Sequence, residues 1–204
     1  MKAEDVQLTQ LLDGAKQFIV PVFQRDYSWE TKHCLQLWKD IIQAGSTQNI
    51  KVHFVGSIVY IAAEENSAKI NRWLLIDGQQ RLTTVLLLLV ALRDYLKREN
   101  ADGQSAAKSI DLPTAAEIDD YYLINRHAFA EDRHKLQLRR SDQASLASIV
   151  DGVALPSSPS ERIAENFAFF QDLVAEADFP TLFAGIKNLL LYRSFCYEDK
   201  MIHN

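Results

Sequence analysis

The chain is poor in the residues that build disulfide frameworks and zinc sites. Its 204 residues include only two cysteines and five histidines. Cys34 and Cys196 lie far apart in sequence, which is typical of reduced thiols in a cytosolic protein. The histidines lack the spacing of zinc ligands. The sequence therefore argues against a disulfide scaffold and against a zinc protein.

Long apolar runs and a surplus of positive charge are missing as well. The apolar run Val85–Leu92 is well short of the ~20 residues that span a bilayer, and Met1–Asp5 does not begin a signal peptide. We therefore expect a cytoplasmic protein with no membrane contact. The formal net charge of −5 argues against a protein that coats nucleic acids through many lysines and arginines. Any nucleic-acid site must therefore be confined to a small basic region of the surface.

What the chain does contain is enough apolar material for a core, at 48% of its residues. The patterns predict an α+β fold in two parts. Residues 1–98 are expected to form a small mixed sheet with helices, and residues 99–204 a mostly helical extension. Strands are predicted at 18–23, 53–61 and 72–76, the last two as a hairpin, and helices at 6–12, after Ser28, near Tyr121 and Leu146, and after Ser160.

The segment Leu74–Thr84 carries the most information. It has the pattern of a strand, a tight polar turn and the start of a buried helix. The first N–H groups of a helix have no partner within the helix and favour bound anions. In this turn, Gly78 would allow close approach of a ligand, and Arg81 carries a planar set of donors that suits phosphate oxygens. Thr83 and Thr84 could add hydroxyl contacts, so the sequence predicts a phosphate site.

The remaining residues of the turn leave alternatives open. Asp77 would repel a phosphate unless it caps the helix, accepts a ribose hydroxyl, orients water or reaches the phosphate through a divalent cation. Gln79 and Gln80 could read a nucleobase or a phosphate edge. A purely structural interpretation combines an Asp cap, a glycine turn and an Arg81 that is paired with a carboxylate. Neither the GxxxxGK[ST] nor the GxGxxG pattern is present.

Three motifs in order closely resemble the N-terminal domain of GmrSD-type restriction endonucleases. They are Ile19–Trp29, His53–Val59 and the DGQQR string Asp77–Arg81, and the similarity covers the chain from Val6 to Ala175. The resemblance implies a ParB/sulfiredoxin-like fold. It also implies a role in defence against foreign DNA, often DNA with modified bases or backbones.

The resemblance implies roles for two strips of residues. Asp77–Arg81 would be linked to binding and hydrolysis of a nucleoside triphosphate such as ATP or GTP, with Asp77 and Arg81 catalytic and Mg²⁺ as the expected ion. Gln24, Arg25, Tyr27 and Trp29 would form a second strip nearby that contacts nucleotide or DNA. Chemically, Arg25 can hold a phosphate while Tyr27 or Trp29 offers a stacking face. The alternative is that Trp29 and Phe23 belong to the core and Arg25 forms a surface ion pair.

Two further features have a functional and a structural interpretation. His53, at the start of its strand, could donate to a phosphate or act as an acid or base near neutral pH, or be structural. The basic cluster Arg133–Arg140 could contact DNA, although a solvated face balanced by nearby acidic residues is the simpler interpretation.

The leading functional hypothesis is a nucleotide-binding module, with candidate triphosphatase activity, of a modification-dependent restriction or phage-defence system. Complete relatives continue into a nuclease domain, which we do not expect in this chain, so a nuclease subunit is an expected partner. Loss of that region would expose Leu189–Leu191 and favour a homo-oligomer. The alternatives are a non-catalytic module that binds modified DNA or regulates, and an inactive remnant.

Overall fold

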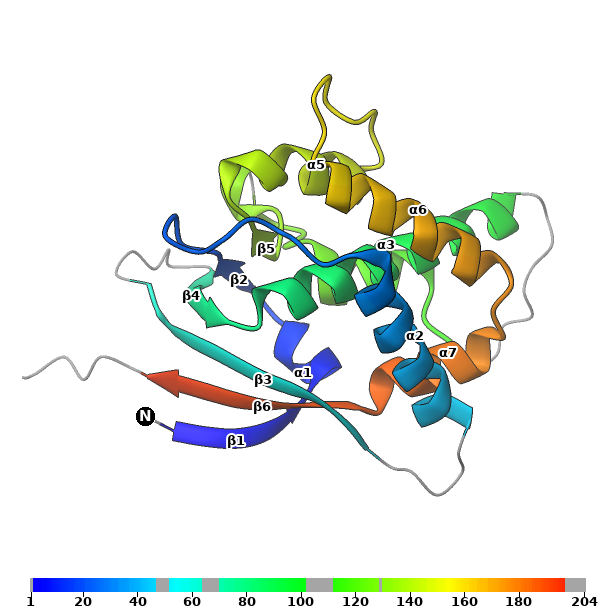
Figure 1. The fold of residues 1–204 in the computed structure, drawn as a ribbon, viewed down its shortest axis with the longest axis horizontal. Helices are drawn as coiled ribbons and strands as arrows, with labels where there is room; N and C mark the ends of the chain where they lie inside the picture. The colour runs from blue at the N-terminus through cyan, green and yellow to red at the C-terminus, as the bar shows by residue number, and fades with distance from the viewer. Residues whose placement is uncertain (1, 47–51, 64–69, 102–111, 129, 197–204) are drawn as a thin grey trace, which may run out of the picture.

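The structure, a computed structural model, describes residues 2–46, 52–63, 70–101, 112–128 and 130–196 (Figure 1). It has an α+β fold, as the sequence predicts, with a six-stranded mixed sheet and helices. Among the described helices, none combines the length and the apolar character that are needed to cross a membrane.

The sheet has the strand order β1-β6-β3-β4-β2-β5. Its strands are β1 (Lys2–Gln7), β2 (Lys16–Ile19), β3 (His53–Ala62), β4 (Asn71–Asp77), β5 (Leu136–Gln137) and β6 (Leu189–Cys196). β3 pairs with β4 in antiparallel orientation, which confirms the predicted hairpin. β6 is antiparallel to β1 and parallel to β3, whereas β2 is parallel to both β4 and β5.

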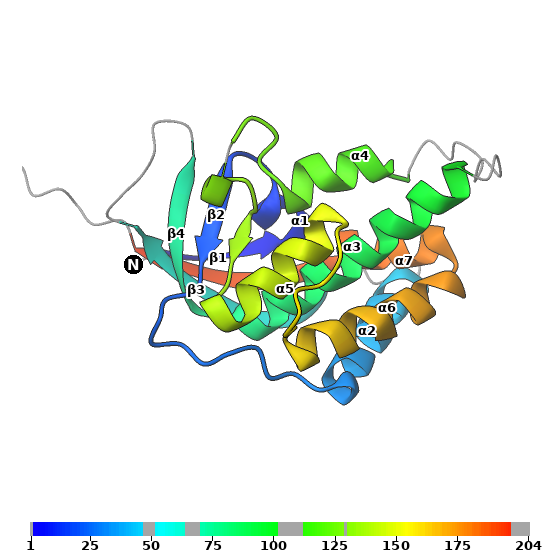
Figure 2. The ribbon, with the colours of Figure 1, turned by 90° about the horizontal axis from the view of Figure 1, so that it is seen from above.

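The helices are gathered mainly on one side of the sheet, with α3 at their centre (Figures 1 and 2). They are α1 (Leu8–Leu12), α2 (Thr31–Ser46), α3 (Gln79–Ala101), α4 (Ala115–Ile118), the π-helical turn η1 (Asp119–Leu123), the 3-10 turn η2 (Ala130–Asp132), α5 (Arg140–Asp151), α6 (Glu161–Ala175) and α7 (Phe179–Lys187). α2 and α7 form a separate pair at the end of the sheet where β6 begins (Figure 1).

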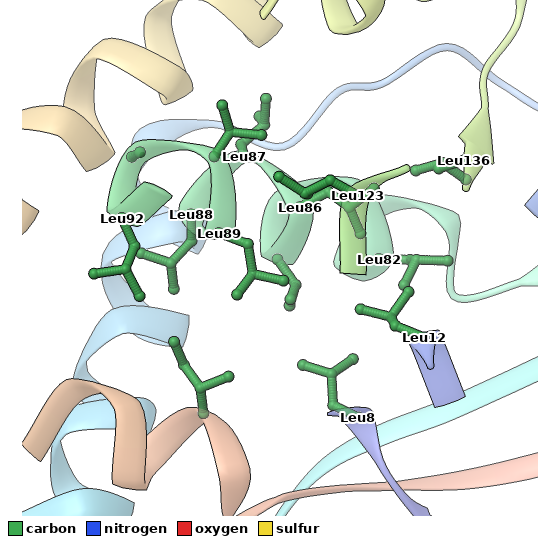
Figure 3. Close-up of a cluster of buried hydrophobic side chains, with 14 of the residues drawn as sticks. Leu8, Leu12, Leu82, Leu86, Leu87, Leu88, Leu89, Leu92, Leu123 and Leu136 are labelled. Carbon is green, nitrogen blue, oxygen red and sulfur yellow. The ribbon is translucent and has the colours of Figure 1, made fainter. Parts of the chain in front are cut away.

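Helix α3 is the core of the molecule because its central residues, Val85–Leu92, are all buried, at 2% exposure or less. A helix that is apolar all round must be covered on every side. Figure 3 shows its leucines surrounded by Leu8 and Leu12 of α1, Leu123 of η1 and Leu136 of β5. The predicted strand, turn and buried helix therefore exist as β4, Gly78 and α3.

The second half of the chain is less purely helical than expected, because it contributes β5 and β6 to the sheet. β6 lies between β1 and β3, so residues near both ends of the chain share one sheet. The expected exposure of Leu189–Leu191 is wrong. Leu189 and Leu191 are 0% and 3% exposed, because this segment forms the internal strand β6 and both side chains pack in the core of the same chain. A homo-oligomer remains a prediction, but exposure of Leu189–Leu191 no longer supports it.

The predicted strand at 18–23 is shorter in the structure. β2 ends at Ile19, and residues 20–30 form an irregular connection, here called the β2–α2 loop. Pro21 has no N–H to donate to a neighbouring strand, which favours an end to the strand there. Val22 and Phe23 are 85% and 74% exposed, so the interpretation of Phe23 as a core residue is wrong.

Candidate functional site

The β2–α2 loop and the turn between β4 and α3 border one hollow of about 190 Å³, here called the β4–α3 hollow. Gly78 has φ 91°, a conformation that glycine adopts readily, and it lets the chain turn directly from strand to helix. The hollow is lined by Gln24, Arg25, Trp29, Asp77, Gly78, Gln79, Gln80 and Arg81. The structure thus brings together the two strips that the resemblance relates.

Gln80 holds the β2–α2 loop by its backbone. Its Oε1 accepts from the N–H groups of Ser28 at 2.8 Å and Trp29 at 3.2 Å. Its Nε2 donates to the carbonyl of Asp26 at 3.0 Å. The amide is buried and bonded on both sides, so its geometry supports positioning of the loop and not the expected reading of a nucleobase.

Two other amides tie the same loop to the turn. Nε2 of Gln79 donates to the carbonyl of Arg25 at 3.1 Å, and Nε2 of Gln24 donates to the carbonyl of Ile76 in β4 at 2.8 Å. Oε1 of Gln79 is buried and has no hydrogen-bond partner in the described part of the chain. The three glutamines together fix the position of the loop backbone at Arg25.

The two threonines and the tyrosine lie beneath the site and do not line the hollow. Thr83 and Thr84 are 1% and 0% exposed, and their hydroxyls donate to the carbonyls of Gln79 and Gln80, both at 2.8 Å. The hydroxyl of Tyr27 bonds to that of Thr84 at 2.7 Å. The expected hydroxyl contacts with phosphate and the expected stacking face of Tyr27 do not fit this placement, because all three side chains are buried and their hydroxyls bond within the protein.

Tyr27 is also held by the helical region. Its hydroxyl accepts from Nδ2 of Asn166 in α6 at 3.0 Å, and the same Nδ2 donates to the carbonyl of Trp29 at 2.8 Å. Its N–H donates to Asp142 of α5 at 2.6 Å. Burial raises the pKa of the Tyr27 phenol, which is therefore neutral. Residues far along the chain thus determine the shape of the β2–α2 loop.

Arg81 is a half-buried cation without a carboxylate partner among the residues that the structure describes. Its Nη1 donates to the carbonyl of Ser57 in β3 at 3.0 Å. Burial lowers the pKa of the Arg81 guanidinium, and the charge of Asp77 opposes that effect without an ion pair. The structural alternative in which Arg81 pairs with a carboxylate is therefore not what the structure shows.

Arg25 and Asp77 are both exposed at the hollow. Within the described ranges, neither side chain makes a hydrogen bond or an ion pair, so Asp77 does not cap α3 and Arg25 is not in a surface pair. Asp26, the residue that follows Arg25, forms an ion pair with Arg139 at 3.0 Å. The first N–H groups of α3 begin at Gln79 and face no acceptor in the described structure.

Trp29 is half-buried and lines the hollow while it packs against the core. Its ring stacks on His33, with centroids 5.7 Å apart and planes at 27°. His53 lies elsewhere, at the start of β3, where its Nε2 is 3.9 Å from a carboxylate oxygen of Asp40. The structure does not bring His53 to the hollow.

The basic cluster does not form a continuous surface. Arg133 and His134 both contact Asp151, at 3.2 and 3.0 Å. Lys135 is 2% exposed, and its ammonium donates to backbone carbonyls, among them that of Leu12 at 2.8 Å. Burial lowers the pKa of Lys135 to about 8. A DNA-contacting role for the cluster as a unit therefore does not fit its geometry.

Sequence reasoning missed Gly56 and Ser57 as parts of the site. They lie in the motif His53–Val59, in which only His53 was given a possible functional role, yet the Ser57 carbonyl holds Arg81. The available signal was a glycine inside a strand rich in β-branched residues, which often marks a bulge or a close approach of backbone. In the described residues, no group of three or more His, Cys, Asp or Glu side chains could hold a metal ion.

Comparison with known proteins agrees with the motifs. The family model for the N-terminal domain of GmrSD restriction endonucleases matches residues 8–201, nearly the whole chain. The chain belongs to this family, which places it among the components of restriction systems. No curated protein matches it.

Proposed function

We propose that this member of the GmrSD N-terminal domain family binds a nucleoside triphosphate in the β4–α3 hollow, as the nucleotide-binding module of a modification-dependent restriction system. One observation carries the proposal. Arg25, Arg81 and the first N–H groups of the 23-residue helix α3 meet at one hollow, and no described carboxylate is paired with either arginine. Anions are favoured at such a place.

The phosphate chain would contact Arg81 and the start of α3. A guanidinium can form two parallel hydrogen bonds to phosphate oxygens, and among the described residues Arg81 uses only one N–H, in its bond to Ser57. Arg25 would supply a second positive charge from the rim. The hollow of about 190 Å³ is smaller than the ~300–1,000 Å³ of most ligand pockets, so it suits the phosphate chain while the base lies against Trp29 or outside.

Asp77 is the residue that would hold Mg²⁺. Mg²⁺ in nucleotide sites is bound by one or two carboxylates together with phosphate oxygens and water. Asp77 is an exposed carboxylate at the hollow without a hydrogen bond among the described residues, which fits that donor set. Bound there, Mg²⁺ would neutralise phosphate charge.

Hydrolysis is the finer part of the proposal. Asp77 would orient a water molecule, and Arg81 would stabilise the charge that develops on the transferred phosphoryl group. Gln79 and Gln80 would act through the loop that they hold and not through the nucleotide. Because the Nε2 groups of both side chains donate to backbone carbonyls and Oε1 of Gln79 is buried, we expect little discrimination between ATP and GTP.

The test is calorimetric titration of ATP and GTP, with and without Mg²⁺. Wild type is expected to bind saturably, and Arg81→Ala is expected to lose binding while its circular dichroism stays unchanged. Arg126→Ala is the matched control, because Arg126 is 61% exposed and pairs with Asp120 outside the hollow. Wild-type protein that binds neither nucleotide at millimolar concentration would refute the proposal.

A second candidate function is DNA binding by the β2–α2 loop. Val22 and Phe23 are 85% and 74% exposed beside Arg25, and such apolar exposure often marks a contact surface. Under this hypothesis, affinity for DNA falls steeply with salt, and modified DNA competes better than plain DNA only if the modification is read. Binding that ignores both salt and modification would count against it.

A further inference from the structure

Gly56 of β3 lies against the guanidinium of Arg81. A Cβ atom placed on Gly56 would lie 2.6 Å from Nη2, 2.7 Å from Cζ and 3.0 Å from Nη1 of Arg81. Three atoms of one planar group at such distances mean that the guanidinium lies directly over the glycine. Any side chain at position 56 would displace it.

The backbone at Gly56 is also special. Its φ is +117°, a conformation that L side chains rarely adopt. The register between β3 and β6 shifts between Phe54 and Gly56, so the strand carries an irregularity at this point. Strand irregularities of this kind re-aim groups next to functional sites.

The residue that follows supplies the anchor. The pairing of β3 with β4 begins at Val59, opposite Asp77, so Ser57 lies beyond the paired part of β4. Its carbonyl accepts from Nη1 of Arg81 at 3.0 Å and would lie 3.0 Å from a Cβ on Gly78. One carbonyl therefore touches both Arg81 and the glycine of the turn, and Gly78 is required by this contact as well as by its φ.

We propose that Gly56, Ser57 and Gly78 form a support that holds the Arg81 guanidinium in place, with its unused N–H groups available to the phosphate chain in the β4–α3 hollow. Gly56 is then a positioning residue for that site, and this inference rests on the proposed function. Arginine has five N–H donors, and only one is bonded here among the described residues. A guanidinium fixed before binding loses less side-chain entropy when the ligand arrives.

A general structural role for Gly56 would act differently from a support for Arg81. The strain of a positive φ is the same whatever residue stands at position 81, whereas the clash requires a guanidinium. A double-mutant cycle separates the two, because contacting residues show coupling and independent residues do not.

The experiment measures Mg·ATP binding by wild type, Gly56→Ala, Arg81→Lys and the double variant. We expect Gly56→Ala to weaken binding by about tenfold or more in the wild-type background. In the Arg81→Lys background the same change should cost less than about threefold, because a lysine lacks the planar group. Gly152→Ala is the control, with φ +67° but no atom within 4 Å of its Cβ, and it should bind as wild type does. Equal losses in the two backgrounds would overturn the proposal.

A second measurement depends neither on nucleotide nor on the folding of Gly56→Ala. In wild-type protein, the side-chain nitrogen resonances of Arg81, assigned by their absence in Arg81→Lys, should show slow guanidinium rotation and slow hydrogen exchange. An Arg81 that behaves like a freely rotating arginine would overturn the support. If wild type binds no Mg·ATP, the proposed function fails, and this measurement alone decides whether the support exists.

Discussion

Two arginines on the same helix have opposite surroundings. Arg93, in the middle of α3, is 2% exposed, whereas Arg81, at its start, is half-buried and bonds to one carbonyl. The Arg93 guanidinium is bound by the carboxylates of Asp94 and Asp119 and by the carbonyls of Ile149 and Val150.

The difference separates a structural cation from one that can bind a ligand. Arg93 ties α3 to η1 and to the end of α5, and its donors are engaged within the protein. Arg81 is partly removed from water, which costs desolvation free energy, and no carboxylate in the described structure pairs with it to offset that cost. Functional sites often retain groups of this kind. The contrast implies that loss of Arg93 should affect folding, while loss of Arg81 should affect binding.

The largest effect is expected from Arg93→Ala. Removal of one partner from a buried ionic network leaves the others uncompensated, and it costs about 3–5 kcal/mol of unfolding free energy. Urea denaturation measures this. Arg98→Ala on the same helix is the control, because Arg98 is exposed over the ring of Tyr95 and should contribute no more than about 1 kcal/mol. Similar losses in both variants would break the comparison.

A smaller effect is expected from Gln80→Leu. The change removes the hydrogen bonds from the amide to the β2–α2 loop, so that the N–H of Ser28 and the carbonyl of Asp26 lose their partner. The unfolding free energy should fall by about 1–3 kcal/mol. Nucleotide affinity should fall as well, since the loop carries Arg25. Gln36→Leu, where an exposed amide donates to Asp40 in the same helix, should change neither quantity. A Gln80→Leu protein with unchanged stability would show that the loop is held by other contacts.

Arg81→Ala should leave stability nearly unchanged and abolish binding, the opposite of what is expected for Arg93→Ala. We expect the unfolding free energy to change by no more than about 1 kcal/mol, because a single hydrogen bond is lost and a half-buried charge is removed. Nucleotide binding should be abolished. Urea denaturation and Mg·ATP titration on the same sample give both quantities. A large loss of stability would place Arg81 with Arg93 as a structural residue.

The smallest effect is expected at Asp151, whose ion pairs are partly exposed. Burial alone would raise the pKa of the Asp151 carboxyl, but hydrogen bonds and charges from His134 and Arg133 hold it below its ordinary value. A carboxyl with a lowered pKa stabilises the fold above its ordinary pKa, and that contribution is lost as pH falls. Asp151→Asn should therefore cost about 0–1 kcal/mol at neutral pH, and the difference from wild type should shrink in acid. A difference that grows in acid would contradict this sign.

Local patterns predicted the parts of the fold that depend on neighbouring residues. The strand, turn and helix around Gly78 and the β3–β4 hairpin are set by apolar periodicity and by one glycine. The place of β6 between β1 and β3 was not predicted, because strand partners far apart in sequence leave no local signal. A sequence pattern also could not show that Thr83 and Thr84 face inward. A helix that is apolar all round has no polar face from which the buried side could be identified.

The sequence by itself determined the α+β class, the family and the strip Asp77–Arg81 as the place of interest, because motif order and periodicity are properties of the chain alone. Only the tertiary structure decided which side chains of that strip are available. The Nε2 groups of Gln79 and Gln80 donate to the backbone of a loop about fifty residues earlier, and Arg81 is held by β3. A side chain's chemistry becomes free or occupied according to what folds against it, and those partners come from distant parts of the chain.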